Sequence, residues 1–264
     1  MLIKAKKSLG QNFLIDENIL KKIVNIGKIS SNTEVLEIGP GTGNLTEYIL
    51  KKNPKKIFVI EKDNNLVDLL KNKFQKKIEI INSDVLKIDE NYIFKSKVTV
   101  FGNLPYNIST QILSKWINQI KNENFWFSKL ILMFQKEVAD RIIAKENTKN
   151  FGRLSIISNW KLDIEKIIDI KPGSFIPKPK VNSSLLLFKP KKNFIKIEKN
   201  ENLEMITRIF FNQRRKKIKK SFNKLFNNPK LIIKKLKIDE NLRPQNLSLE
   251  TYLKITKEYE SLRN

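Results

Sequence analysis

The segment 34-EVLEIGPGTGNLTEYIL-50 decides how the first half of the chain must fold. Its opening residues form a short apolar run typical of a buried strand, and residues 44–50 space their apolar side chains at intervals of three and four, as an amphipathic helix does. Between the two lie Gly39, Gly41 and Gly43, three of only eight glycines in 264 residues. A glycine-rich turn between a strand and a helix lets the backbone approach a ligand closely. The segment therefore predicts a strand, a ligand-binding turn and a helix.

The same alternation continues to about residue 135. Short apolar runs predict buried strands, and amphipathic stretches between them predict helices. The expected strands cover 56–61, 77–82, 97–102 and 129–134, and the expected helices after the first cover 64–74 and 109–120. This is a βαβ series, which predicts an α/β fold with a parallel sheet and helices on both of its faces.

The second half changes in character. A helix is expected over 135–145, and strands are expected over 153–162 and 181–190, on either side of the proline-rich loop 171–180. Beyond Pro190 come helical segments with heavy positive charge, at 203–226, 229–237 and 249–262. We therefore predict a larger α/β domain over 1–190 and a small, basic, α-helical domain over 191–264.

Composition excludes several kinds of chemistry. The chain has no cysteine and no histidine, which removes thiol nucleophiles, disulfides, Cys/His metal sites and every scheme based on a histidine acid or base. Its 52 Lys and Arg against 27 Asp and Glu give a net charge of +25, which favours a polyanionic partner such as nucleic acid or an anionic membrane surface. With no apolar run long enough to span a membrane and no signal-peptide core, a cytoplasmic protein is expected.

Acidic side chains follow two of the expected strands. Glu61 ends the second strand, where a carboxylate can accept hydrogen bonds from both hydroxyls of a ribose, and Asp84 follows the third, where it can accept from an adenine amino group. Asn44 stands where a dinucleotide-binding fold would have its third glycine. The set favours S-adenosylmethionine, a nucleoside cofactor without phosphates. The alternative is structural, because glycine turns are common and strand-end carboxylates often cap helices.

The segment 103-NLPY-106 follows the fourth strand and suits methylation of a nucleobase amino group. If the side-chain oxygen of Asn103 and the carbonyl oxygen of Leu104 each accept one N–H, the amine can pyramidalise and direct its lone pair at a methyl group. Pro105 fixes the local backbone, and Tyr106 offers a ring face for the base. No strong base is required, since the amine becomes acidic once it is alkylated. The alternative is an ordinary strand exit with a proline stop.

The motifs 10-GQNFL-14, 37-EIGPGTG-43, 61-EKD-63, 83-SDVL-86 and 103-NLPYNIST-110, in this order, resemble those of the ribosomal RNA adenine N6,N6-dimethyltransferases, the KsgA family. The resemblance covers nearly the whole chain. It implies a Rossmann-like class I S-adenosylmethionine-dependent methyltransferase domain and a small C-terminal α-helical domain. The cofactor-binding residues that it implies are Asn12, Leu14, Glu37, Gly39, Gly41, Glu61, Asp84 and Asn103.

The resemblance also implies how the target is held. Asn103, Leu104 and Tyr106 would bind the target adenine, and Phe175 of 175-FIPKPKVNS-183 would stack on its other face. The alternative for Phe175 is a hydrophobic plug in a hairpin loop. A base held between two rings must leave its helix or loop, which requires flipping or a single-stranded target.

The C-terminal stretches 210-FFNQRRK-216 and 243-RPQNLS-248 are similar to signatures of the same family. Lys220 stands where the family commonly has Asn, and Gln245 where it commonly has Glu. Only seven of the 52 basic residues are arginine, and such residues grip phosphate in a planar, bidentate way. The expected RNA contacts are Arg208, Arg214, Arg215, Lys216 and Lys219; a surface-solubility role or lipid binding is the alternative.

Four functions are distinguished. The first is dimethylation of two adjacent adenosines near the 3′ end of small-subunit (16S) rRNA, with a role in assembly of the precursor small ribosomal subunit. The others are a large-subunit rRNA adenine methyltransferase of the macrolide-resistance type, a DNA amino-methyltransferase, and a non-enzymatic ribosome assembly factor. The resemblance favours the first, acting as a monomer with no metal and no membrane partner. The sequence leaves open which nucleotides are methylated, whether naked rRNA is a substrate, and how processive the transfers are.

Overall fold

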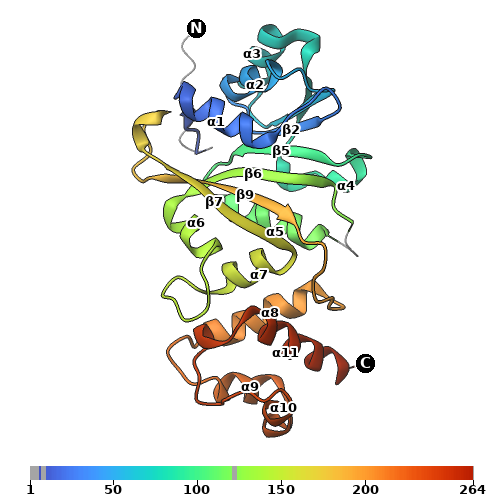
Figure 1. Cartoon of the computed structure of the whole chain (residues 1–264), viewed down its shortest axis with the longest axis vertical. Helices are drawn as coiled ribbons and strands as arrows, with labels where there is room; N and C mark the ends of the chain where they lie inside the picture. The colour runs from blue at the N-terminus through green and yellow to red at the C-terminus, as the bar shows by residue number, and fades with distance from the viewer. Residues whose placement is uncertain (1–5, 7–9, 121–123, 264) are drawn as a thin grey trace. The chain divides into compact units, whose positions relative to one another are not determined.

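The computed structural model describes residues 6, 10–120 and 124–263, and its contacts divide the chain into two compact units (Figure 1). The first unit comprises Met1–Ala139 and Asp163–Pro190, and the second comprises Asp140–Leu162 and Lys191–Asn264. The division predicted from the sequence, 1–190 and 191–264, differs from this one in residues 140–162. These residues share their contacts with the C-terminal segment, which is distant in the sequence.

A seven-stranded sheet forms the centre of the first unit. Its order is β4 (Glu79–Asn82), β3 (Lys56–Glu61), β2 (Glu34–Ile38), β5 (Val98–Asn103), β6 (Phe127–Gln135), β9 (Ser183–Pro190) and β7 (Leu162–Ile170). The first five run parallel, and β9 pairs antiparallel with β6. The strands predicted up to residue 135 are confirmed, as is the parallel α/β sheet. The strand expected to be buried at 77–82 is instead the partly exposed edge strand β4, because only one of its sides has a neighbouring strand.

The register of the parallel strands aligns the expected site residues. Ile38 at the end of β2 lies opposite Ile60 of β3 on one side and Gly102 of β5 on the other. The next residues, Gly39, Glu61 and Asn103, therefore emerge side by side at the carboxyl edge of the sheet. The chain order reverses between β2 and β5, and such a switch point is where open α/β sheets bind ligands.

Both faces are buried at the centre of the sheet. Val35, Val59 and Phe101 belong to a core cluster shared with α1 (Glu17–Gly27), α2 (Asn44–Leu50) and α3 (Asn64–Phe74). The alternate residues of the same strands, such as Leu36 and Val100, are also fully buried, so the opposite face is covered as well. The further helices are α4 (Glu90–Ile93) and α5 (Ser109–Gln119). The helices predicted at 64–74 and 109–120 are thereby confirmed.

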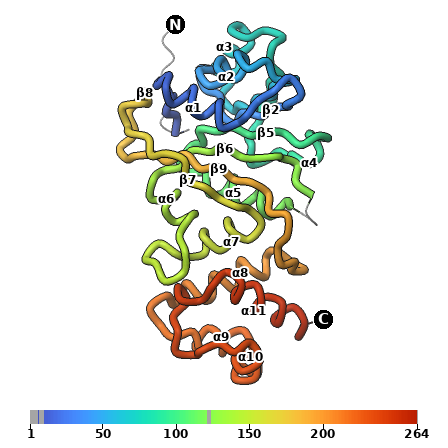
Figure 2. Tube along the Cα trace, in the orientation of Figure 1, coloured from blue at the N-terminus to red at the C-terminus, as the bar shows by residue number. Residues whose placement is uncertain are grey.

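A short second sheet joins the N-terminal segment to the proline-rich loop. β1 (Phe13–Leu14) pairs antiparallel with β8 (Phe175–Ile176), which lies in the loop between β7 and β9 (Figure 2). The Ile15 N–H extends this pairing by donating to the Ser174 carbonyl oxygen at 2.9 Å. Two segments about 160 residues apart in the sequence are thus held together beside the sheet.

The second unit is helical. It contains α7 (Arg153–Lys161), α8 (Asn200–Phe211), α9 (Lys219–Leu225), α10 (Pro229–Lys235) and α11 (Leu249–Ser261), and α6 (Lys136–Ile142) runs into it from the first unit. Its core includes Phe210, whose ring lies edge-on to Phe222 and Tyr252 at centroid distances of 5.5 and 5.4 Å. Within the described residues, no helix is both long and apolar enough to cross a membrane.

Two predictions in this region are wrong. Residues 153–161, expected as part of a strand, form α7, whose Ile156, Ser158 and Trp160 are all buried. A helix that is buried around most of its circumference shows little 3.6-residue periodicity, so its apolar run resembles that of a strand. The charged stretch expected to be helical over 203–226 is interrupted between α8 and α9, where the Ile218 N–H instead donates to the Leu242 carbonyl oxygen at 2.9 Å.

Candidate active site

A cavity of about 220 Å³ opens at the carboxyl edge of the sheet, wholly within the first unit. It is lined by all eight residues expected to bind the cofactor, together with Leu104 and Tyr106, which were expected to hold the target adenine. Lining residues that the sequence analysis did not single out include Phe13, Met133 and Asn107. Strand pairing brings Phe13 of β1 and Met133 of β6 to the cavity, and Asn107 directly follows the NLPY segment.

The glycine turn forms one wall of this cavity. Gly39 and Gly41 have φ values of +63° and +58°, in the left-handed region that favours glycine. A Cβ atom added at Gly39 would meet no atom within 4 Å, so the turn leaves open space next to its backbone. One added at Gly41 would lie 2.6 Å from Cδ1 of Phe13. The turn therefore requires glycine, at Gly41 because of Phe13 and at Gly39 because of its φ.

Glu61 is held in one orientation at the end of β3. Its Oε1 atom accepts the backbone N–H groups of Lys62 and Asp63, both at 2.9 Å, while Oε2 has only a long contact of 3.4 Å to the Gly41 N–H. Burial raises the pKa of the Glu61 carboxyl, although these N–H groups oppose the shift. The carboxylate is thus fixed through one oxygen, and the other is weakly engaged.

Glu37 is the most deeply buried acid of the cavity, at 2% exposed. Burial raises its pKa to about 7, and the neighbouring Glu61 adds to this shift, whereas the Thr46 hydroxyl, which donates to Glu37 Oε2 at 2.6 Å, opposes it. A carboxyl group with such a pKa gains its negative charge readily when a cation comes close.

Asp84 has two structural partners. Its Oδ1 atom accepts the Leu86 N–H at 3.0 Å and so caps a short 3₁₀ turn, and Oδ2 lies 2.9 Å from Nζ of Lys62. The hydrogen bond from Lys62 and that from Leu86 hold the pKa of Asp84 below its usual range. The capping interpretation is therefore correct in part, but a carboxylate offers about four lone-pair sites and can accept another donor.

Asn103 is oriented by the N-terminal segment. Its Nδ2 atom donates to the Asn12 carbonyl oxygen at 2.6 Å, and the Asn12 side chain donates in turn to the Gly10 carbonyl oxygen at 3.2 Å. With Nδ2 engaged, Oδ1 is the atom of this amide left to accept a hydrogen bond at the cavity. The structure thus sets the polarity of the Asn103 amide, which the sequence could not.

The two aromatic residues expected around the target base differ in their surroundings. Tyr106 lines the cavity, and its hydroxyl lies 2.5 Å from the Ser183 hydroxyl. Burial raises the pKa of Tyr106, so the phenol stays protonated. Phe175 does not line the cavity: it is fully buried in the core cluster, paired with Leu14. In this structure Phe175 is a core residue, as the alternative interpretation had it, and stacking would require its exposure.

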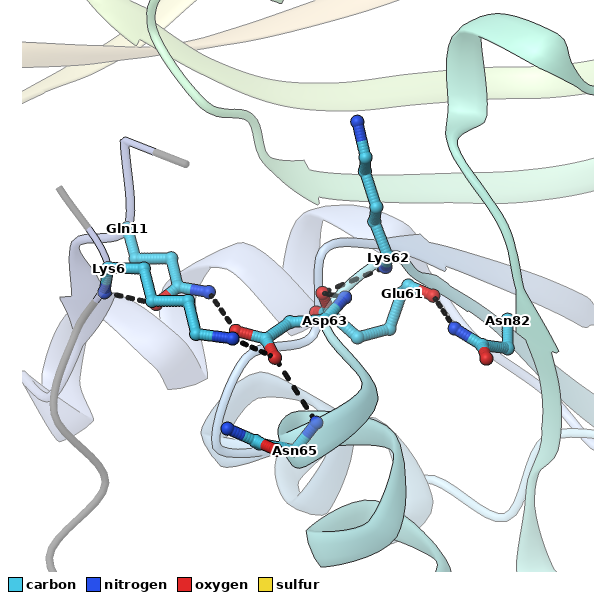
Figure 3. A network of polar contacts seen from close by, with 7 residues as sticks. All are labelled: Lys6, Gln11, Glu61, Lys62, Asp63, Asn65 and Asn82. Carbon is cyan, nitrogen blue, oxygen red and sulfur yellow. Dashed lines mark hydrogen bonds and ion pairs between the residues drawn. The ribbon is translucent and has the colours of Figure 1, made fainter. Parts of the chain in front are cut away.

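Asp63 connects the N-terminal segment to the strand that carries Glu61, as Figure 3 shows. Its carboxylate accepts hydrogen bonds from Nζ of Lys6 at 2.7 Å and from Nε2 of Gln11 at 3.1 Å. As the N-cap of α3, it also accepts one from the Asn65 N–H at 3.1 Å. Burial alone would raise the pKa of Asp63, but these donors outweigh it and lower that pKa. The Asp63 network was missed in the sequence, since the spacing of 61-EKD-63 suggests only a helix cap.

The charged side chains that line the cavity fit S-adenosylmethionine. Glu37, Glu61 and Asp84 line it, whereas Lys62 is the only basic residue among its lining residues in the described part of the chain. Such a set would repel phosphates and suits a cationic nucleoside whose hydroxyl and amino groups donate hydrogen bonds. Across residues 6, 10–120 and 124–263, no three Asp or Glu side chains cluster in a way that could hold a metal ion.

The expected RNA-binding residues lie in the second unit, and none of them lines this cavity. Arg208 is exposed on α8, Arg215 and Lys216 are exposed in the turn after it, and Lys219 begins α9 with an ion pair to Glu240 at 3.0 Å. Arg214 is half-buried, and its guanidinium donates to the carbonyl oxygens of Thr148 and Lys149. These arginines and lysines form a basic surface around the end of α8.

Comparison with known proteins places the chain among ribosomal RNA methyltransferases. A family model described as ribosomal RNA adenine dimethylase matches residues 2–261. The chain is 64% identical to ribosomal RNA small subunit methyltransferase A of Pelagibacter ubique (strain HTCC1062), over 100% of both chains. It is 46% identical to the protein of the same name from Ehrlichia ruminantium (strain Gardel), over 96% of this chain and 97% of the relative.

Solved structures of rRNA methyltransferases share the fold of this chain. A dimethyladenosine transferase from Plasmodium falciparum superposes with a TM-score of 0.81 and 27% identity, covering 94% of this chain and 98% of that one. The 23S rRNA methyltransferase ErmE shares the fold, with a TM-score of 0.69 and 20% identity over 94% of this chain and 100% of that one. With a match over nearly its full length, the chain belongs to the ribosomal RNA adenine dimethylase family.

Proposed function

We propose that this protein uses S-adenosylmethionine to dimethylate N6 of two adjacent adenosines near the 3′ end of small-subunit (16S) rRNA, and that it acts in biogenesis of the small ribosomal subunit. The observation that carries the proposal is the orientation of Asn103. Its amide nitrogen is fixed on the Asn12 carbonyl oxygen, so its oxygen is left to accept an N–H of the target amine. The acidic, glycine-lined cavity beside it supports the cofactor assignment.

The residues of the cavity divide between the parts of the cofactor, which supplies an electrophilic methyl group on a sulfonium. Glu61 would accept hydrogen bonds from the ribose hydroxyls through Oε2, its less engaged oxygen. Asp84 would accept from the adenine amino group, while Gly39 lets the backbone come close. Asn12, Leu14, Glu37 and Gly41 would line the methionine part, where Glu37 ionises as the positive charge arrives.

The target adenine would be held by the NLPY segment. Two acceptors, Oδ1 of Asn103 and the carbonyl oxygen of Leu104, would take the two N–H bonds of the amine and align its lone pair for attack. Tyr106, partly exposed at the cavity, would stack on the base. A neutral amide is sufficient here, because the alkylated amine loses its proton easily to solvent.

The names of the relatives favour the small subunit over the large one. Relatives called ribosomal RNA small subunit methyltransferase A match at 42–64% identity over nearly the whole chain. The large-subunit enzyme ErmE, at 20% identity, shares only the fold. We expect the protein to act on the precursor particle in the cytoplasm as a monomer, with the basic helical unit binding RNA.

The proposal is tested by incubating the protein with labelled S-adenosylmethionine and unmodified small or large ribosomal subunits, then analysing the digested nucleosides by mass spectrometry. Dimethyladenosine confined to small-subunit rRNA is the expected result. Label found only in the large subunit would instead favour a large-subunit rRNA adenine methyltransferase of the macrolide-resistance type. Transfer to neither subunit would favour a non-enzymatic assembly factor.

A further inference from the structure

A second cavity, of about 880 Å³, lies entirely within the helical unit. Three segments line it: the end of α6 with residues 147–154, the end of α8 with the turn after it, and residues 245–246. Its volume is within the range of about 300–1,000 Å³ typical of small-ligand pockets. None of the residues that line the first cavity lines this one.

The charge of this second cavity is entirely positive. Among its twelve described lining residues are Arg141, Lys149, Arg153 and Arg214, and none of the twelve is Asp or Glu. Three of the seven arginines in the chain therefore meet at one cavity, although lysine is the usual basic residue elsewhere. Guanidinium groups bind phosphate oxygens in a planar, bidentate way that lysine cannot reproduce.

The walls of the cavity are fixed by hydrogen bonds within the unit. The Arg214 guanidinium donates to the carbonyl oxygens of Thr148 and Lys149. The Asn147 N–H donates to the Gln245 carbonyl oxygen at 2.9 Å, and Nδ2 of Asn246 donates to Oδ1 of Asn147 at 2.8 Å. A site held in this way loses little freedom when a ligand binds.

Two further groups indicate a nucleotide rather than a bare anion. The ring of Phe211 lines the cavity and is braced by Tyr252, stacked at a centroid distance of 5.9 Å, so it offers a rigid apolar face. Oε1 of Gln245 is buried and has no hydrogen-bond partner in the described part of the chain, so it lacks a donor. An aromatic face and an amide acceptor are the groups with which proteins hold unpaired bases.

We propose that this cavity binds one unpaired nucleotide of the ribosomal RNA substrate, as an anchor distinct from the adenosine that is methylated. The arginines hold the phosphates on either side, the base lies against Phe211, and Gln245 accepts a hydrogen bond from its amino or imino group. The proposal rests on the proposed function only in taking ribosomal RNA as the partner. It adds a discrete recognition site to the basic surface of the helical unit.

The test is equilibrium binding of the full-length protein to unmodified small ribosomal subunits at several salt concentrations. Arg153→Ala is expected to weaken affinity about tenfold and to lower the salt slope by about one phosphate contact. Gln245→Ala is expected to weaken affinity about fivefold with an unchanged slope, because it removes no charge. Matched controls of the same residue classes are Arg263→Ala, whose side chain stacks on Tyr259 outside the cavity, and Asn223→Ala at an exposed site.

Each outcome decides the proposal. An equal loss of affinity in Arg263→Ala and Arg153→Ala would show a general charge effect and overturn the proposal. Wild-type affinity in Gln245→Ala would mean that the cavity contacts only phosphate, which would also overturn the proposal. Arg153→Lys, which keeps the charge, replaces Arg153→Ala if that variant does not fold, and should still weaken binding. Failure of the wild-type protein to methylate either subunit would count against the proposed function, whereas the cavity is judged by binding alone.

Discussion

A single hydrogen bond decides which end of the Asn103 amide faces the cavity. Because Nδ2 donates to the Asn12 carbonyl oxygen at 2.6 Å, Oδ1 serves as the acceptor. Asn103→Ala should abolish methyl transfer, with the affinity for S-adenosylmethionine only modestly reduced, since the carboxylates proposed to bind the cofactor remain. Turnover and cofactor affinity measured on the same preparation check this. Unchanged turnover would remove Asn103 from the mechanism.

Glu37 makes the stability of the unliganded protein depend on pH. Its pKa is about 7 in the folded protein against 4.5 as the ordinary value, so the folded state binds the extra proton between these pH values and stability falls as pH rises through that window. The cost of ionisation approaches about 3 kcal/mol above pH 7. The stability advantage of Glu37→Gln over the wild type should therefore grow by about that amount as the pH rises from 5 to 8.

Chemical denaturation of both proteins across this pH range measures the difference. Glu37→Gln keeps an acceptor for the Thr46 hydroxyl, so the packing around it is preserved. Glu47→Gln, at an exposed carboxylate of the same helix as Thr46, is the matched control and should show no such gain. A difference that stays constant from pH 5 to pH 8 would mean that Glu37 titrates normally in the folded state.

Phe175 and Tyr106 were expected to act as a pair, but only Tyr106 lines the cavity. Phe175 is fully buried against the core, so Phe175→Ala should reduce the free energy of unfolding by about 3–5 kcal/mol. Phe175→Leu should largely restore stability. If Phe175 only fills space in the core, the same variant should restore activity too. Thermal unfolding and the KM for the particle separate the two roles. A stable Phe175→Leu variant with a strongly raised KM would show that Phe175 leaves its packing to stack on the base.

At the scale of elements, the N-terminal segment is fastened to the sheet by the Asp63 network. Asp63→Asn keeps the N-cap of α3 but loses the ion pair to Lys6 and weakens the contact to Gln11, so the segment that carries Asn12 is less well held. We expect a KM for S-adenosylmethionine raised about tenfold, with little change in thermal stability. Steady-state kinetics and a melting curve test this.

A double-mutant cycle sharpens the test. Gln11→Ala alone should also raise the KM for the cofactor, and the double variant with Asp63→Asn should be little worse than the worse single variant, because both act through one contact. Asp68→Asn, on the same helix and exposed, is the control for the loss of one charge. Fully additive effects would show that Asp63 and Gln11 act separately.

The elements of the first unit could be predicted because each signal was local. A glycine-rich turn, an acidic strand end and NLPY each follow a buried strand, and parallel pairing then aligns Gly39, Glu61 and Asn103. Contacts distant in the sequence could not be predicted in this way. The pairing of β1 with β8, the burial of Phe175 and the grouping of α7 with the C-terminal helices all depend on packing that no single stretch specifies.

For the molecule as a whole, a net charge of +25 gives a general attraction to RNA. A specific phosphate contact must therefore contribute more to affinity than the same charge at another exposed position. Replacing Arg214 and Arg215 with alanine removes two guanidinium groups from the basic surface at the end of α8. We expect weaker binding to small subunits and a salt slope reduced by nearly two. The control pair Lys230→Ala and Lys257→Ala removes the same charge from exposed positions of the same unit. Equal losses in both pairs would mean that net charge, and not this surface, determines binding, whereas an affinity that does not respond to salt would exclude phosphate contacts by the helical unit.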